Sequence, residues 1–394
     1  MTAHAKLAVI FAPTAALALL APLAGQSLAP RESLEELTTA ARRDSNDAAA
    51  QYLLGLGFWN KQRYDDAERV FRLAVAIEPR FAPGWLALGV LPFARRPKLR
   101  EEQMKGHVPE DWKETLAESE RSIRRAFLVD PLVDLRILSS VDRARRWAVR
   151  VVNGRLYISQ DPFAFLEEGQ YRLAFDLFDA DMPSQRDSVT LSSVPSPLLW
   201  YHGICAAHLN LYTIAIHDFQ SLLDRALARE RSDSLLRMPL ATNDYRYLLA
   251  LMYQREADWL DAVPLYRAAL ENDLGLYMAH LQLARIFAAR GMLDSAVIES
   301  RAAVVVNPED PSLLLEHGAV LMAAGQFTAA EDTLRRSMEA NSRESQAPYF
   351  LGVTLQAMNR PNEARDAFER FLSLAPSRLT EKIAEAKRRL AMLQ

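Results

Sequence analysis

The chain has 394 residues, of which half are hydrophobic and a quarter are charged, with only 14 Gly and 20 Pro. This composition excludes collagen-like and low-complexity chains and argues against global disorder. The formal net charge is −3 at pH 7, so the overall charge does not indicate a nucleic-acid-binding protein. The one cysteine, Cys205, cannot form an intrachain disulfide.

The first 25 residues have the pattern of an export signal. Lys6 provides a weakly positive start, and Leu7–Ala21 forms an apolar stretch of the length that a secretory signal needs. The alternatives are an uncleaved anchor, for which Leu7–Leu23 is barely long enough, and an ordinary buried helix. We expect residues 1–25 to be a cleaved signal peptide and the protein to be periplasmic or secreted, with N-terminal anchoring to the inner membrane as the alternative.

The rest of the chain repeats with a period of 34 residues. Small residues recur at this spacing at Gly55 and Gly89, and then at Ala250, Ala284, Gly318 and Gly352. Aromatic and small residues follow each of them at fixed distances, and a proline ends most repeats; in the first repeat these residues are Tyr64, Ala67, Phe71, Ala74 and Pro79. The small residues let two helices approach closely, and the aromatic residues fill the space beside them.

The stretch Trp85-Leu86-Ala87-Leu88-Gly89 matches the W-x-x-L-G run of the tetratricopeptide repeat (TPR), a pair of antiparallel helices with this period. The chain therefore resembles an exported bacterial TPR protein. The resemblance implies an all-α helix-turn-helix solenoid of about seven to eight repeats. They follow an N-terminal segment at 26–47 and occupy 48–131 and 196–376, before a capping helix at 377–394.

Two regions depart from the repeat pattern. The second repeat is interrupted by an insertion at 94–111, and 132–195 is irregular, with one degenerate repeat. Within it, Asn153-Gly154 lies between β-branched and aromatic residues, which predicts a small hairpin over Val149–Ile158. Two further segments, Met182–Pro197 and Arg229–Asn243, are interpreted as connecting loops.

No catalytic motif is recognisable in the sequence. His202 and Cys205 share a helix face, but two ligands make a poor metal site, and buried structural residues are the better interpretation. The carboxylate pair Glu167 and Glu168 is more simply explained as solvated helix surface than as a hidden hydrolase site. We therefore expect no enzyme activity, no cofactor and no metal.

The TPR resemblance also implies a binding surface, because first helices of successive repeats line a concave groove in that family. The positions that point into the groove carry Tyr52, Trp59, Asn60, Leu86, Trp200, His208, Tyr247, Gln254, Arg255, Arg285 and Tyr349. Tyr and Trp are favoured as interface anchors. For each aromatic residue the alternative is ordinary core packing between helices.

A second candidate surface is an arginine-rich patch formed by Arg143, Arg145, Arg146, Arg150 and Arg155. Such a patch could hold an anionic ligand, although a solvated face is more usual. The leading hypothesis is a non-enzymatic interaction scaffold of the bacterial cell envelope that binds a protein segment in its groove. The alternative is a lipid- or polysaccharide-handling accessory protein that uses the patch. We expect protein partners, no nucleic acid, and no integral membrane span in the mature chain.

Overall fold

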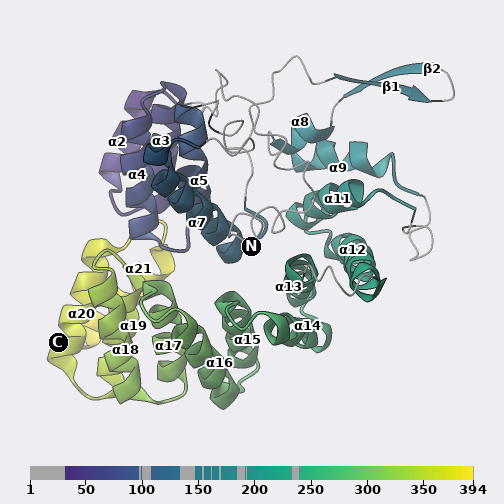
Figure 1. The fold of residues 1–394 in the computed structure, drawn as a ribbon. Helices are drawn as coiled ribbons and strands as arrows, with labels where there is room; N and C mark the ends of the chain where they lie inside the picture. The colour runs from purple at the N-terminus through teal and green to yellow at the C-terminus, as the bar shows by residue number, and fades with distance from the viewer. Residues whose placement is uncertain are drawn as a thin grey trace. The chain divides into compact units, whose positions relative to one another are not determined.

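The computed structural model describes residues 32–96, 99, 108–133, 147–152, 155–160, 162–167, 170–183, 191, 193–232 and 239–393 (Figure 1). Its described residues form two compact units. The first unit runs from Leu86 to Asp273, and the second combines Ala29–Trp85 with Leu274–Gln394. The predicted signal peptide at 1–25 lies outside the described residues.

The second unit consists of antiparallel helix pairs. The first pair is α3 (Ala48–Asn60) and α4 (Tyr64–Ile77), preceded by α2 (Leu34–Arg43). The later helices are α15 (Tyr277–Ala289), α16 (Leu293–Val306), α17 (Pro311–Ala323), α18 (Phe327–Ala340), α19 (Gln346–Ala357), α20 (Pro361–Leu374) and α21 (Thr380–Met392). The predicted capping helix is present as α21, whose Ala386 is fully buried against the last pair.

The first unit contains two clear helix pairs and a less regular part. The pairs are α11 (Ser196–His208) with α12 (Tyr212–Ser232), and α13 (Pro239–Arg255) with α14 (Trp259–Asn272). The other elements are α5 (Ala82–Arg95), whose first four residues are assigned to the second unit, η2 (Glu110–Trp112), α7 (Lys113–Val129), β1 (Trp147–Val152), β2 (Arg155–Gln160), α8 (Pro162–Glu167) and α9 (Tyr171–Asp179). Within the described parts of the chain, none of the helices combines the length and apolar character needed to cross a bilayer.

The repeat spacing follows from one close contact inside each pair. A side chain on Gly203 of α11 would lie 2.8 Å from the ring of Phe219 on α12, closer than real contacts allow. The same conflict would arise between Gly55 and Phe71, between Gly318 and Leu334, and between Gly352 and Phe368. Each large residue follows its glycine by sixteen positions, so the predicted register of these pairs is confirmed.

Between the paired helices the chain makes a left-handed turn. Within the described parts of the chain, the residues with positive φ are Gln62, Asn210, Ala257, Gly291, Gly325 and Asn359. Each lies seven positions after the small residue of its first helix, so the turn is part of the repeat. Glycine adopts this conformation without strain, whereas other residues incur a conformational cost.

Local capping fixes where several helices begin. Ser33 and Glu36 form a reciprocal capping box at the start of α2. Asp310 caps α17 by accepting a hydrogen bond from the amide of Ser312 at 2.9 Å, with Pro311 in the first turn. Ser196 does not act in this way: it is the first residue inside α11, and its hydroxyl accepts a hydrogen bond from Arg225.

The irregular regions agree only in part with the sequence pattern. β1 and β2 pair antiparallel where the hairpin was expected, with Val152 opposite Arg155 on either side of the Asn-Gly pair. The predicted loop Arg229–Asn243 is wrong at both ends, because α12 continues to Ser232 and α13 begins at Pro239. Most of the insertion at 94–111, and Gly169 of the degenerate repeat, lie outside the described residues.

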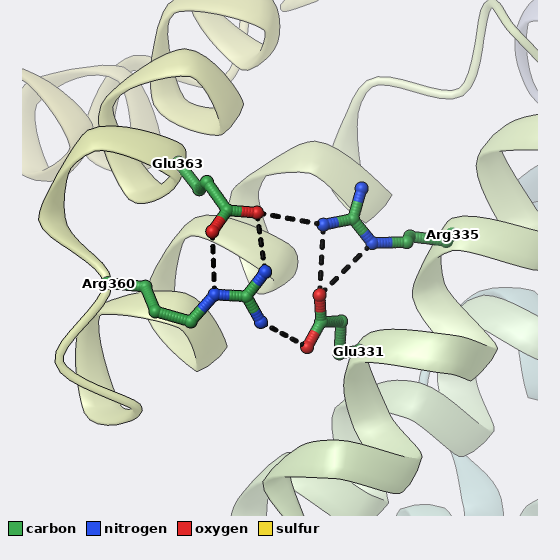
Figure 2. Close-up of polar contacts among 4 residues, drawn as sticks. All are labelled: Glu331, Arg335, Arg360 and Glu363. Atoms are coloured by element: carbon green, nitrogen blue, oxygen red, sulfur yellow. Dashed lines mark hydrogen bonds and ion pairs between the residues drawn. The ribbon is translucent and has the colours of Figure 1, made fainter.

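A closed ring of charges ties two successive repeats together (Figure 2). Glu331 and Arg335 lie on α18, while Arg360 and Glu363 lie at the start of α20, and each carboxylate contacts both arginines. The distances are 2.6 Å for Arg360–Glu331 and 2.9 Å for Arg335–Glu331. Hydrogen bonds from Arg335 and Arg360 outweigh the effect of burial and lower the pKa of Glu331. The ring therefore links the second helices of neighbouring repeats.

The contact at Gly89 gives a direct test of the repeat register. An added β-carbon would lie 3.0 Å from the backbone nitrogen of Ile123 and 3.1 Å from the carbonyl oxygen of Ser119 on α7. We expect Gly89→Leu to lower the free energy of unfolding by about 3 kcal/mol, because backbone cannot move aside as a side chain can. Urea titration measures the change. A variant as stable as the wild type would show that α5 and α7 are not paired in this register.

The left-handed turns give a second test, free of steric effects. An added β-carbon at Gly291, where φ is +73°, meets nothing within 4 Å. We expect Gly291→Ala to destabilise by about 1 kcal/mol through backbone strain alone. The reverse change at the equivalent turn, Ala257→Gly, relieves the same strain and should be neutral or stabilising. If both substitutions destabilise equally in urea titrations, backbone conformation does not control these turns.

Candidate partner-binding surface

In the second unit, the predicted groove residue Arg285 forms an ion pair with a carboxylate on the neighbouring first helix. The guanidinium of Arg285 on α15 donates to Glu316 on α17 at 2.6 Å. Arg80, in the turn after α4, donates to the same carboxylate oxygen. Burial raises the pKa of Glu316, but Arg285 and Arg80 outweigh it and hold that pKa below its usual value. Burial and the nearby Arg285 lower the pKa of Arg80. Glu316 is thus an ionised carboxylate shared by two arginines.

Tyr349 provides the aromatic part of this surface on α19. Its ring lies 5.2 Å from that of Phe371 in an edge contact and is half-buried. Lys382 of α21 lies 5.8 Å from the centre of the same ring and donates to Gln346. Burial lowers the pKa of Lys382. The capping helix therefore contributes a cation to the surface of the last repeat, which the sequence pattern of first helices did not indicate.

In the first unit, the candidate residues combine half-exposed aromatic rings with polar groups. Trp200 on α11 is half-buried, with its ring 5.9 Å from Tyr245 and 5.8 Å from Phe219. The ring of His208 stacks on Tyr171 of α9, with centres 3.8 Å apart. These contacts orient the rings while leaving part of each accessible.

Two polar candidates lie at the end of α13. The side-chain oxygen of Gln254 accepts a hydrogen bond from Tyr266 at 2.6 Å, which fixes its orientation. Arg255 is exposed, and its guanidinium lies 5.9 Å from the ring of Tyr212. Together with Trp200 and His208, these residues give the first unit a surface able to make both aromatic and hydrogen-bonding contacts.

Three of the predicted groove residues are buried in the core. Trp59, Leu86 and Tyr247 are only 5%, 1% and 6% exposed. The ring of Trp59 packs edge-on against Tyr64, and that of Tyr247 against Tyr266. Their role as exposed anchors is corrected accordingly: Trp59 and Tyr247 match the core-packing alternative, and all three large apolar side chains fill space between helices.

The remaining candidates of the first repeat are partly accessible. Tyr52 is half-buried, with its ring 5.4 Å from Phe81. Asn60, at the end of α3, has a side-chain oxygen that is buried and lacks a hydrogen-bond partner among the described residues. Of the arginine-rich patch, Arg143, Arg145 and Arg146 lie outside the described residues, whereas Arg150 lies on β1 and Arg155 on β2.

His202 and Cys205 are fully buried on α11, as the structural interpretation predicted. His202 contacts Asp218 of α12 at 2.5 Å and Asp179 of α9 at 3.3 Å, so it joins three helices. Burial raises the pKa of the Cys205 thiol to about 12, which leaves it protonated and unreactive at neutral pH. Among the described residues, no group of three or more His, Cys, Asp or Glu side chains is placed to hold a metal ion.

Two other features lie outside the predicted groove. A cavity of about 370 Å³ borders the second helix α12, with His217, Gln220, Ser221 and Arg225 in its wall. His317 on α17 contacts the hydroxyl of Ser300 at 2.8 Å. Burial, with Arg301 and Arg336 nearby, lowers the pKa of His317 to about 4, so this side chain is neutral at pH 7.

Comparison with known proteins supports the repeat assignment. The tetratricopeptide repeat family model matches residues 19–83 and 315–378. DnaJ homolog subfamily C member 3 of Bos taurus is 25% identical over 128 residues, which cover 32% of this chain and 25% of that protein. A TPR repeat-containing protein of Dictyostelium discoideum is 31% identical over 71 residues, which cover 18% of this chain and 27% of that protein. This chain spans about a quarter of the length of these curated relatives.

This chain is also similar to solved structures, at low sequence identity. The C-terminal part of a TPR repeat-containing protein from Cytophaga hutchinsonii has 13% identity and a TM-score of 0.46, covering 59% of this chain and 86% of that one. YrrB, described as a TPR protein with an unusual peptide-binding site, has 19% identity and a TM-score of 0.33, covering 44% and 92%. The tetratricopeptide repeat family model thus matches two stretches of this chain, and the helix pairs of the structure form a helical solenoid of the kind such repeats build.

Proposed function

We propose that this TPR-repeat chain is a non-enzymatic scaffold that binds a protein segment along its first helices. One observation carries the proposal: half-exposed aromatic, amide and basic side chains recur on the first helices of both units, held in place by second-helix or neighbouring residues. They are Trp200, His208, Gln254, Arg255, Arg285 and Tyr349. Rings that are already fixed bind with little loss of side-chain entropy.

The chemistry of these residues favours a polypeptide as the ligand. Gln254 and Arg255 offer hydrogen bonds of the kind that a peptide backbone or an acidic side chain accepts. Trp200 and Tyr349 offer apolar area beside them. An extended segment presents both kinds of group at short intervals, so we propose that the partner is a protein rather than a small molecule.

We further propose that the scaffold works in the bacterial cell envelope after export. The support is the apolar stretch Leu7–Ala21 behind Lys6 in the sequence. We expect the mature chain to begin near Gln26 and to fractionate with periplasmic or extracellular proteins. N-terminal sequencing of the native protein tests this expectation, and a soluble cytoplasmic protein that retains Met1 would contradict it.

Binding through the first helices has its own test. We expect Trp200→Ala and Arg255→Ala each to weaken binding by about 1–3 kcal/mol, because truncation removes an anchoring contact. The immobilised mature chain first captures partners from the envelope fraction, and mass spectrometry identifies them. The purified partner is then titrated against each variant by biolayer interferometry.

The matched control is Trp259→Ala, which removes a half-buried tryptophan from the second helix α14. This variant should bind like the wild type. Thermal melts of every variant separate loss of contact from loss of folding. If Trp200→Ala and Arg255→Ala melt normally and bind with unchanged affinity, the first helices are not the binding surface.

A further inference from the structure

Within the second unit, residues far apart in the sequence meet through hydrogen bonds and ion pairs. Arg80 donates to Glu316 of α17, and the side-chain amide of Asn341 donates to the carbonyl oxygen of Ala76 at 2.7 Å. The amide of Ser377 donates to Asp44 at 2.8 Å. We call this set of contacts between residues 44–80 and α17–α21 the latch, and it includes the ion pairs of Arg378 described below.

The donors of the latch lie in turns between helices, where short local bonds fix the shape of the chain. The turn after α4 is closed by a bond from the amide of Phe81 to the carbonyl of Glu78, and the indole of Trp85 donates to Pro79. The turn after α20 is closed by a bond from Leu379 to Pro376. These turns present Arg80 on one segment and Arg378 on the other.

Arg378 makes two ion pairs with the N-terminal segment. Its guanidinium lies 2.5 Å from the carboxylate of Glu78 and 3.3 Å from that of Asp47. Its side chain is 48% exposed, and those of Glu78 and Asp47 are 38% and 20% exposed. Ion pairs with this exposure are individually weak and are screened by salt.

Each segment also keeps apolar packing of its own. In the N-terminal segment, Leu37 and Leu54 belong to one buried cluster, and Ala74 and Ile77 to another. In the C-terminal segment, Leu351 and Phe368 belong to a third. Opening the latch therefore need not dismantle these clusters.

The Arg80 contact can open without leaving a buried charge unpaired. Glu316 is bonded to Arg285 at 2.6 Å as well as to Arg80, so it retains a partner when Arg80 leaves. Burial and the repulsion of Arg285 both disfavour the charged form of Arg80 at this place and lower its pKa. Removing one partner of an isolated buried pair would carry a far larger penalty. Both the closed and the open states are thus electrostatically satisfied at Glu316.

Charges from both segments also surround a second carboxylate. Glu344 is buried, and its pKa is raised by burial and by Glu78, while Lys382 and Arg80 act to lower it.

We infer that the face of the C-terminal repeats around Glu316 is a docking surface for basic chain segments, and that its occupant in this structure is the chain's own N-terminal repeat, held by the salt-sensitive latch. A partner that docks at Glu316 must supply a positive group in place of Arg80. That consequence rests on the proposed scaffold function, whereas the latch itself is tested without any partner.

Double electron–electron resonance, which measures the distance between two spin labels, tests the latch. Cysteines replace the exposed residues Lys61 and Arg370, one in each segment, in a Cys205→Ala background. We expect one narrow distance distribution at about 0.1 M NaCl and a broader one with longer distances at about 1 M, where the screening length falls from about 10 Å to about 3 Å. The double variant Arg80→Gln/Arg378→Gln should show the broad distribution already at about 0.1 M.

The matched control is Arg63→Gln/Arg69→Gln, which removes the same charge from α4 and its N-cap, where both arginines pair locally with Asp66. It should keep the narrow distribution. Circular dichroism verifies that each variant retains its helices, and the salt titration of the labelled parent decides the question if a variant does not fold. A broad distribution at low salt, or a narrow one that neither salt nor Arg80→Gln/Arg378→Gln changes, would overturn the latch while leaving the proposed scaffold function untouched.

Discussion

The architecture depends on one steric constraint, the close approach of a small residue on each first helix to a large residue on the second helix. Gly352 leaves no room for a side chain beside Phe368, and fully buried Ala250 and Tyr266 occupy the same two positions in another repeat. The left-handed residue lies between them, seven positions after the small one. The small residue, the turn and the large residue of the second helix therefore keep fixed separations along the chain. A period of 34 residues results when such pairs are stacked.

The same constraint decides which aromatic residues remain for binding. A large residue placed where paired helices approach becomes core, as Trp59 and Tyr247 do. Trp200 keeps an accessible edge, although it too packs against a second-helix ring, that of Phe219. What is left on the first helices is a mixture of partly covered rings and polar groups such as Gln254 and Arg255. This mixture suits recognition of a segment with a regular backbone better than binding of an apolar ligand.

The repeats could be predicted from the sequence because their interactions are local and periodic. The contact between Gly55 and Phe71 lies within one repeat and recurs with fixed spacing, and the cap at Asp310 is local to its own helix. The extents of α12 and α13 were mispredicted, because polar residues near 229–243 resemble a loop even though both helices continue into them. The bond between Arg80 and Glu316 joins residues 236 positions apart, and no periodicity indicates it. The partners of His202 were missed for the same reason, because Asp179 and Asp218 come from other helices.

Apolar and charged contacts consequently have different roles in this chain. Burial of rings such as Phe219 and Phe368 stabilises individual helix pairs, and the free energy of such burial depends little on salt. Charged groups instead connect parts that already pack by themselves. In the ring of Glu331, Arg335, Arg360 and Glu363, shared carboxylates join adjacent repeats that also share apolar contacts (Figure 2). At the ion pairs of Arg378, which join segments with separate apolar clusters, ionic strength can alter the contact without altering the repeats. A repeat protein built in this way can change which of its surfaces are covered while each helix pair keeps its fold.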